Sequence, residues 1–305
     1  MSGRLMINGL LTGGRLTGLT LSGPMLAGLA LAGSALTAEA QTAPKPKAED
    51  RGFSYFMGVG RYSQTQREAP SVVPVRSKAT ADSPLLVTGA LYAIDVDRLL
   101  SLDAETTFAP SSTTERWTAT AATVGGTTLT SNLLQTNRFS VQQNNTRLLF
   151  QQRLSGPWFA AGGMSFHMHS FKRFGFAAGP DNAVNLPPGA VDETVSEVLL
   201  NAALVLESEH VRGSTRHYGL RVGLARPLWR RVQNTAFPDN DFNGTSGWNA
   251  AIAGRYSVAV HPNMHLGGWA QVMRSERSGQ RQGNVELPRS RTVGLSYGAE
   301  LLWKL

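Results

Sequence analysis

The chain has 305 residues, of which 41% are hydrophobic, and a formal net charge of +8 at pH 7. This length allows one large domain or two small ones, and the absence of cysteine excludes disulfides, zinc thiolates and a cysteine nucleophile. No apolar run of about 18 residues follows the N-terminal region, so we expect no transmembrane helix in the mature chain. A transmembrane β-barrel is compatible with these values, because alternation of polar and apolar residues keeps its mean hydropathy low.

The N-terminal segment has the three parts of a secretion signal. Arg4 and Arg15 supply positive charge, residues 16–36 form an apolar stretch, and residues 38–40 read Ala-Glu-Ala, a small-x-small cleavage pattern. A membrane-anchor helix is the alternative interpretation, but the Gly, Ser and Thr content of the stretch favours cleavage. We therefore predict a signal peptide over residues 1–40 and export of the rest of the chain.

A short hydrophilic segment follows the predicted signal peptide. Residues 41–51 are rich in Pro, Lys and small side chains, which cannot bury a core, and we predict a periplasmic linker there. The composition shows no break afterwards, so we expect a single domain over residues 52–305. Apolar and polar residues alternate in this domain with period two, which indicates strands rather than helices.

Ten segments with this alternation follow one another along the chain. A further segment that begins at Trp117 is either another strand or an extension of one above the membrane, so roughly eight to twelve strands are compatible with the pattern. The ten segments lie at about residues 52–62, 85–96, 99–108, 138–153, 158–170, 197–207, 217–225, 248–258, 265–273 and 293–305.

The connections between these segments alternate in length. Short links such as residues 155–157 and 261–263 alternate with long polar ones. Outer-membrane barrels show this asymmetry, with short periplasmic turns and long external loops, and an even number of strands places both termini on the short-turn side. A soluble sandwich has no reason to alternate its loop lengths in this way. The sequence therefore predicts an all-β fold, an antiparallel up-and-down transmembrane β-barrel of about ten strands.

The last strand carries a pattern of its own. Residues 293–305 alternate apolar positions up to the terminus, with Gly298 on the other face. In this the chain resembles Gram-negative outer-membrane β-barrel proteins, whose final strand typically has a glycine and ends in an aromatic residue. The resemblance implies outer-membrane lipid as a partner, periplasmic termini, and recognition by the barrel-assembly machinery through Gly298, Leu301, Trp303 and Leu305. Leu305 departs from the usual terminal phenylalanine.

Charged residues occupy the face opposite the apolar one. In a barrel of about ten strands this face lines a lumen near the size that side chains can fill. Both signs occur in similar number, and buried charges need partners, which favours a mutually neutralising plug. A narrow conduit for small polar solutes is the alternative, with weak selectivity because no ring of one sign is present. The predicted lumen charge network consists of Asp103, Glu105, Arg147, Arg153, Glu207, His217, Arg221, Arg255 and Glu300.

An enzyme is a third interpretation of this face. Ser165, His167 and His169 share one face of a predicted strand, and Glu197 lies on the next, which supplies a serine, a base and an orienting carboxylate. Some outer-membrane barrels are hydrolases, but a shared fold does not establish an activity. We therefore predict a structural or interaction role with at most limited passive transport, and no catalytic site. The alternative is an outer-membrane hydrolase, of the protease or lipid-deacylase type, that uses these residues.

One loop resembles part of a calcium site. Asp239, Asp241 and Asn243 match the first half of a D-x-D-x-N-G loop, but the twelfth position is Ala250 where an EF-hand has Glu. A turn held by Asx hydrogen bonds is the simpler interpretation. We predict no cofactor, with calcium as the one alternative.

Basic residues gather near the predicted outer ends of the strands. The outer leaflet carries lipopolysaccharide phosphates, and arginine pairs bidentately with phosphate. We therefore predict a cationic collar that binds lipopolysaccharide, with a solvated loop face as the alternative. Nucleic acid is not an expected partner of an exported barrel, and the sequence does not set the oligomeric state. The predicted collar consists of Lys172, Arg173, Arg226, Arg230, Arg231, Arg274, Arg277, Arg281, Arg289 and Arg291.

Overall fold

The structure is a computed structural model, which describes residues 52–71, 73–124, 126–208, 213–283 and 285–305. The predicted signal peptide over residues 1–40 and the predicted linker over residues 41–51 lie outside the described residues. Within the described ranges the chain forms strands and their connections, and it has no helix with the length and apolar character to cross a membrane.

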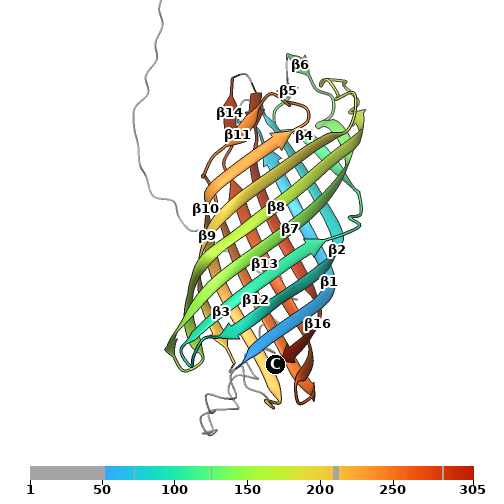
Figure 1. Cartoon of the computed structure of the whole chain (residues 1–305). Coiled ribbons are helices and arrows are strands. Elements are labelled where there is room, and N and C mark those ends of the chain that lie inside the picture. The colour runs from blue at the N-terminus through green and yellow to red at the C-terminus, as the bar shows by residue number, and fades with distance from the viewer. Residues whose placement is uncertain (1–51, 72, 125, 209–212, 284) are drawn as a thin grey trace, which may run out of the picture. The chain divides into compact units, whose positions relative to one another are not determined.

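Ten strands form one closed antiparallel barrel (Figure 1). The ring closes because β1 pairs with β2 on one side and with β16 on the other. The prediction of an up-and-down barrel of about ten strands is confirmed. In ring order the strands are β1 (Phe53–Ala69), β2 (Val75–Ala93), β3 (Arg98–Thr107), β7 (Leu133–Ser155), β8 (Trp158–Ala178), β9 (Val191–Glu207), β10 (Arg216–Asn234), β12 (Trp248–His261), β13 (Met264–Arg277) and β16 (Arg289–Lys304).

One place in this ring is shared by two strands. β3 ends at Thr107, and β4 (Thr113–Ala119) continues the same place farther along, because it pairs with β2 and β7 as β3 does. The segment that contains Trp117 is therefore an extension of a barrel strand, which was one of the two readings that its sequence allows.

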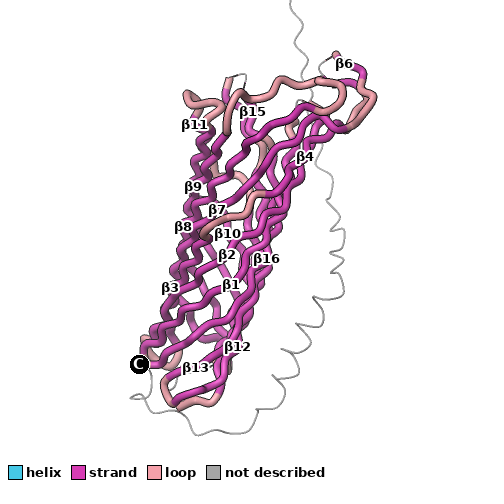
Figure 2. The backbone as a smooth tube through the Cα atoms, turned by 90° about the vertical axis from the view of Figure 1, so that its right-hand side faces the viewer, coloured by secondary structure: helices cyan, strands magenta, loops and turns pink. Residues whose placement is uncertain are grey.

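The two ends of the barrel differ. One end, the short-turn end, carries the C-terminus and turns such as residues 156–157 and 262–263 (Figure 2). The other end, the long-loop end, carries the longer connections. These include the strands β5 (Thr123–Val124), β6 (Thr127–Thr128), β11 (Asp241–Asn243), β14 (Gln280–Gln282) and β15 (Val285–Leu287).

Several strands are longer than the sequence predicts. Residues 70–74 alone connect β1 to β2, where a long loop was expected, and this part of the prediction is wrong. β7 has 23 residues and β8 has 21, whereas a tilted strand crosses a membrane with about 9–11 residues. The additional length lies toward the long-loop end, where polar residues occupy both faces and the amphipathic contrast that marks a strand disappears.

Side chains alternate between the lumen and the outer wall. On β1 the outward residues are apolar from Phe53 to Val59 and mostly polar from Arg61 onward. Near the C-terminus Tyr55 and Trp303 stack on the outer wall with 5.9 Å between their ring centroids, which suits an interfacial girdle. The outer wall thus has an apolar band toward the short-turn end and a polar surface beyond it.

The seam between β1 and β16 depends on glycine. Gly298 lies opposite Gly60 on β1 and opposite Trp269 on β13. A Cβ atom on Gly298 would lie 2.3 Å from the carbonyl oxygen of Val59, which no side chain tolerates without a backbone shift. On the same strand Glu300 faces inward with 2% of its surface exposed. The last strand therefore closes the ring with its apolar residues on the outer wall.

Candidate functional site in the lumen

The middle of the lumen holds an aspartate between two arginines. Asp103 on β3 accepts a hydrogen bond from Arg147 on β7, its direct cross-strand neighbour, and another from Arg221 on β10, both at 2.8 Å. Asp103 is only 7% exposed. β3 and β10 are four places apart in the ring of ten strands, so the bond between Asp103 and Arg221 crosses the lumen instead of following its wall.

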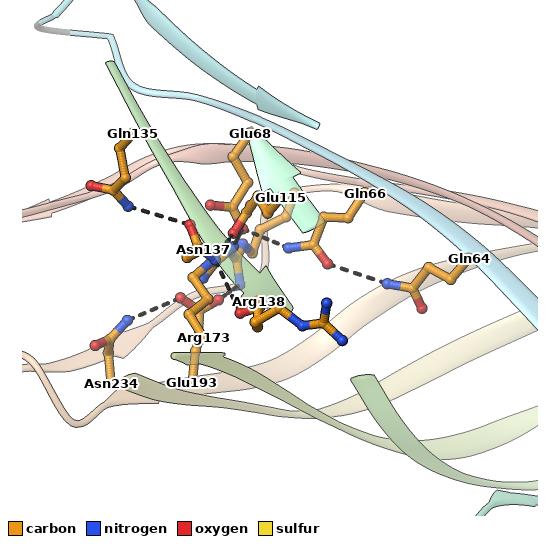
Figure 3. A network of polar contacts seen from close by, with 11 residues as sticks. Gln64, Gln66, Glu68, Glu115, Gln135, Asn137, Arg138, Arg173, Glu193 and Asn234 are labelled. Carbon is orange, nitrogen blue, oxygen red and sulfur yellow. Dashed lines mark hydrogen bonds and ion pairs between the residues drawn. The ribbon is translucent and has the colours of Figure 1, made fainter. Parts of the chain in front are cut away.

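A second ion pair crosses the lumen closer to the long-loop end (Figure 3). Arg173 on β8 lies 2.9 Å from Glu68 on β1 and 2.8 Å from Glu115 on β4, and all three side chains are almost fully buried. Glu68 is also fixed by a chain of amides, in which Gln64 donates to Gln66 and Gln66 donates to Glu68. β8 and β1 are again four places apart in the ring.

Two more arginines pair with glutamates of β9. Arg230 lies 2.7 Å from Glu197, and Arg277 on β13 lies 3.1 Å from Glu193. A buried charge without a partner costs several kcal/mol, roughly, so pairing is what permits these groups inside. The paired groups balance, because the five arginines Arg147, Arg173, Arg221, Arg230 and Arg277 meet the five carboxylates Glu68, Asp103, Glu115, Glu193 and Glu197.

Two small cavities flank the central cluster. Each has a volume of about 60 Å³, and both are lined by Asp103, Glu105, Arg147, Arg221 and Gln271. A cavity needs about 10–15 Å³ of such space to hold one water, so each of the two has room for several water molecules. At this level the side chains of the central cluster leave room for water between them.

Other residues of the predicted network face the lumen in different surroundings. Glu105 accepts a hydrogen bond from Gln271 on β13 at 3.3 Å, again across four places of the ring. The guanidinium of Arg255 lies 4.0 Å from the ring centroid of Phe56, a cation–π contact. The sequence thus identified inward positions, while the partner of each residue comes from strands far apart in the chain.

The network also extends to the short-turn end. His217 Nε2 lies 3.3 Å from Glu207 Oε1, and both side chains are buried. Arg153 donates to the carbonyl oxygen of Val96 at 2.6 Å and closes the turn region instead of joining the central cluster. Its role in the structure is to hold two neighbouring turns together.

The predicted catalytic face is assembled only in part. Ser165 and His167 both face the lumen from β8, and His167 is directly opposite Glu197 on β9. Ser165 Oγ accepts a hydrogen bond from Asn201 at 3.0 Å, and within the described chain no hydrogen bond joins it to a histidine. His167 Nδ1 is 3.9 Å from Glu197, beyond hydrogen-bond distance, while Arg230 holds that carboxylate. The serine therefore has no base.

The predicted cationic collar is wrong for three of its members. Arg173, Arg230 and Arg277 point into the lumen and form the ion pairs described above. The reason is that the barrel strands continue past the apolar band, so that half of the positions there still face inward. The remaining members lie outside the lumen, either exposed or paired with a neighbouring carboxylate, and are Lys172, Arg226, Arg231, Arg274, Arg281, Arg289 and Arg291.

The loop that resembles a calcium site is held by other bonds. Asp241 and Asn243 are the ends of β11, and the guanidinium of Arg231 contacts both carboxylate oxygens of Asp241, at 2.6 and 3.2 Å. Gln280 donates to the carbonyl oxygen of Asn243 at 3.0 Å, and Asp239 lies in the preceding turn. A cation would have to displace the guanidinium, so the geometry lends calcium no support. In the described part of the chain no group of three His, Asp or Glu residues is placed to hold a metal.

Sequence analysis missed the carboxylates at the long-loop end of the lumen. Glu68, Glu115 and Glu193 lie beyond the ends of the predicted strands, in segments taken for loops. A signal was present, because Gln64, Gln66 and Glu68 continue the inward series of β1 with period two. It was weak, since both faces of the strand are polar there.

Comparison with known proteins supports the fold. No protein-family model and no curated sequence matches the chain. Among solved structures, the outer membrane protease OmpT from Escherichia coli aligns with a TM-score of 0.62 at 11% identity, over 87% of this chain and 100% of that chain. The translocator domain of the autotransporter NalP from Neisseria meningitidis aligns with a TM-score of only 0.37 at 9% identity, over 93% of this chain and 100% of that chain.

The fold is therefore that of the Gram-negative outer-membrane β-barrel proteins. An identity of 11% shows the fold alone, and no narrower family is established.

Proposed function

We propose that this chain is an outer-membrane barrel whose lumen is closed by its own side chains, with a structural or interaction role and at most limited passage of small polar solutes. The fold supports the location, because the apolar outer band requires lipid and the closed ring leaves no unpaired strand edge in it. In this orientation the short-turn end and the C-terminus face the periplasm.

The observation that carries the proposal is a set of polar contacts across the lumen. In a water-filled pore these groups would be hydrated at the wall, whereas here they contact each other across the lumen, and all of them except the partly exposed Arg221 are buried. Breaking a buried ion pair leaves an uncompensated charge, so such contacts resist opening. The contacts are Asp103–Arg221, Glu105–Gln271 and Glu68–Arg173, each between strands four places apart in the ring.

The balance of charge supports weak selectivity. The five paired arginines and five paired carboxylates cancel, so this paired network presents no single-sign field that would draw ions of one kind. Any conduction that remains should be small and nearly indifferent to the sign of the ion.

Planar-bilayer recording with the refolded full-length chain tests this proposal. We expect a closed baseline, with at most brief, small and weakly selective openings. Far-UV circular dichroism of the same preparation confirms that the silent protein is a folded barrel. A steady conductance of the size that water-filled porins show would refute the closed lumen.

A hydrolase built on Ser165, His167 and Glu197 is the competing proposal. It is weaker, because Asn201 and not a histidine contacts the serine hydroxyl. Hydrolysis of peptide or lipid-ester substrates that is lost in His167→Ala, and kept in a control with the exposed His261→Ala, would revive it. Equal behaviour of the wild type and both variants leaves the closed barrel as the better account.

A further inference from the structure

A row of like charges crosses the outer wall near the long-loop end. Arg291 on β16 lies directly opposite Arg67 on β1, Arg67 lies directly opposite Lys78 on β2, and Lys78 lies directly opposite Arg116 on β4. We call these four residues the cationic row. Like charges at directly opposed positions destabilise a sheet, so this register works against the stability of the barrel.

The cationic row lines a cleft. The cleft has a volume of about 630 Å³ and also includes Arg76 and Arg289, so six cations from four neighbouring places of the ring surround it. Among the described residues that line it, the one carboxylate is Glu68, which is 3% exposed and is bound by Arg173 on the lumen side. The cleft therefore presents positive charge to the outside.

Little of this charge is neutralised by the chain itself. Glu276 on β13 lies 3.2 Å from Arg289 and 2.8 Å from Arg291, at one edge of the cleft. Within the described residues, none of the other four cations of the cleft forms an ion pair. A site that gathers positive charge against its own repulsion, in a defined cleft, has the properties expected of a binding site for a polyanion.

The position of the row indicates which polyanion. On β16 the outward position next to Arg291 is Val293, which is apolar and 45% exposed, so the row begins at the edge of the apolar band. On β1 three polar outward positions separate Arg67 from Val59, the last apolar one before them. The row thus starts at the lipid boundary and rises away from it, where the phosphates and acidic sugars of an outer-leaflet glycolipid lie.

We propose that this cleft binds the phosphorylated headgroup of lipopolysaccharide. Arginine offers a planar fork that matches phosphate oxygens in pairs, and neighbouring strands set the cations about 4.7–4.9 Å apart in backbone spacing. A phosphate between two opposed cations replaces their repulsion by attraction, so binding stabilises the fold. The inference does not rest on the closed lumen, because the cleft lies on the opposite face of the wall.

This site differs from the collar that the sequence predicts. Only Arg289 and Arg291 belong to both. The other four cations lie in the long-loop halves of β1, β2 and β4, which the sequence pattern did not show to be strands, so their opposed register could not be recognised.

Two charge-matched variants of the refolded full chain test the proposal. The row variant carries Arg67→Gln, Lys78→Gln and Arg116→Gln. The control variant carries Lys172→Gln, Arg226→Gln and Arg281→Gln, which removes the same charge from exposed positions elsewhere. Titration with purified lipopolysaccharide in detergent should show affinity lower by about tenfold or more for the row variant and within about twofold for the control. Equal losses in the two variants, or no loss in either, would overturn the site.

Two further binding measurements separate specific recognition of lipopolysaccharide phosphate from attraction to any anionic surface. Dephosphorylated lipopolysaccharide should bind the wild type about as weakly as intact lipopolysaccharide binds the row variant. Vesicles of phosphatidylglycerol should not reproduce the difference between the row and control variants. If they do reproduce it, the cleft attracts any anionic surface and the proposal fails.

The thermal unfolding midpoint gives a second readout of lipopolysaccharide binding. Lipopolysaccharide should raise the midpoint of the wild type and of the control, and should raise that of the row variant by less. Should the row variant fail to fold, Arg67→Gln alone replaces it, with an expected loss of several-fold in affinity. A midpoint that lipopolysaccharide raises equally in all variants contradicts the proposal.

Discussion

The lumen and the outer wall of this barrel differ in how the charge of their arginines is neutralised. Inside, Arg173 and Arg221 each meet buried carboxylates across the ring. Outside, Arg67 and Lys78 face each other in register with no carboxylate of the described chain in contact. Inside, the protein has to supply the counter-charge, because these groups are largely buried and a buried charge needs a partner. Outside, solvent, salt or a lipid headgroup can supply it.

This difference separates charges that serve the fold from charges that are available for binding. A balanced buried network fixes the strands relative to each other and closes the lumen. The cationic row on the outer wall is not balanced by carboxylates of the described chain and lowers the stability of the barrel. An anionic ligand outside the chain would account for it.

Removing one inward arginine should destabilise the barrel strongly. Arg173→Ala leaves Glu68 and Glu115 buried without their partner, and we expect the free energy of unfolding to fall by about 3–5 kcal/mol. Urea unfolding of the refolded barrel in detergent measures it. The outward Arg226→Ala is the matched control, with an expected change within about 0.5 kcal/mol.

A rescue variant sharpens this prediction. Adding Glu68→Gln and Glu115→Gln to Arg173→Ala removes the uncompensated charges and should restore most of the lost stability. If Arg173→Ala costs no more than Arg226→Ala, the inner network is not what holds the long-loop end together.

The seam of the barrel should be the next most sensitive place. Gly298→Leu introduces a side chain where a Cβ already meets the Val59 carbonyl oxygen at 2.3 Å, so the backbones of β1 and β16 must separate. We expect a loss of about 1–3 kcal/mol. Ala299→Leu, on the outward face of the same strand, should change little. Equal tolerance of the two substitutions would show that the seam does not require glycine.

Neutralising the cationic row should slightly raise the free energy of unfolding, whereas the substitutions above lower it. Without lipopolysaccharide, the variant with Arg67→Gln, Lys78→Gln and Arg116→Gln should be more stable than the wild type by about 0.5–1 kcal/mol at low salt. High salt should shrink the gain, because it screens exposed charges. A variant that is less stable than the wild type would mean that the row already has partners within the chain.

The smallest effect is expected at an exposed loop contact. Asp181 accepts hydrogen bonds from the Thr130 hydroxyl at 2.5 Å and from the Ser131 backbone N–H at 3.0 Å, and these bonds, the hydroxyl first, hold the pKa of Asp181 below its ordinary value. The contact therefore stabilises the loop fully above about pH 4 and is lost as the pH falls through the lowered pKa.

Hydrogen exchange of the loop amides measures this contact. Comparing the wild type with Asp181→Asn at each pH removes the intrinsic pH dependence of exchange. The wild type should protect Thr130 and Ser131 better at neutral pH, and the difference should vanish in strong acid. A difference that persists in strong acid would show that the carboxylate charge is not involved.

The same contrast explains what the sequence could and could not reveal. Toward the short-turn end, lipid on one side and a polar lumen on the other enforce strict alternation, so the inward positions of Asp103 and Arg221 were predictable. Toward the long-loop end both sides are polar, and the strands around Glu68 and Glu115 carried no amphipathic signal. Arg173 was consequently assigned to the outer wall, although it points into the lumen.

Pairing across the lumen was beyond sequence reasoning for a second reason. Whether Asp103 meets Arg221 depends on the register of every strand between β3 and β10, and those registers are set by hydrogen bonds around the whole ring. The alternation pattern indicated that charges of both signs face the lumen. It did not reveal the contacts that make the lumen a barrier.

The closed lumen is tested most directly by single-channel recording of a variant without the cross-lumen ion pairs. The variant replaces Asp103, Arg221, Glu68 and Arg173 by Ser, which leaves the net charge unchanged and removes two contacts between opposite strands. A control replaces Arg61 and Asp82, an ion pair on the outer wall, by Ser. The account predicts a silent wild type, a silent control and a conducting variant. A wild type that conducts as well as the variant would contradict it.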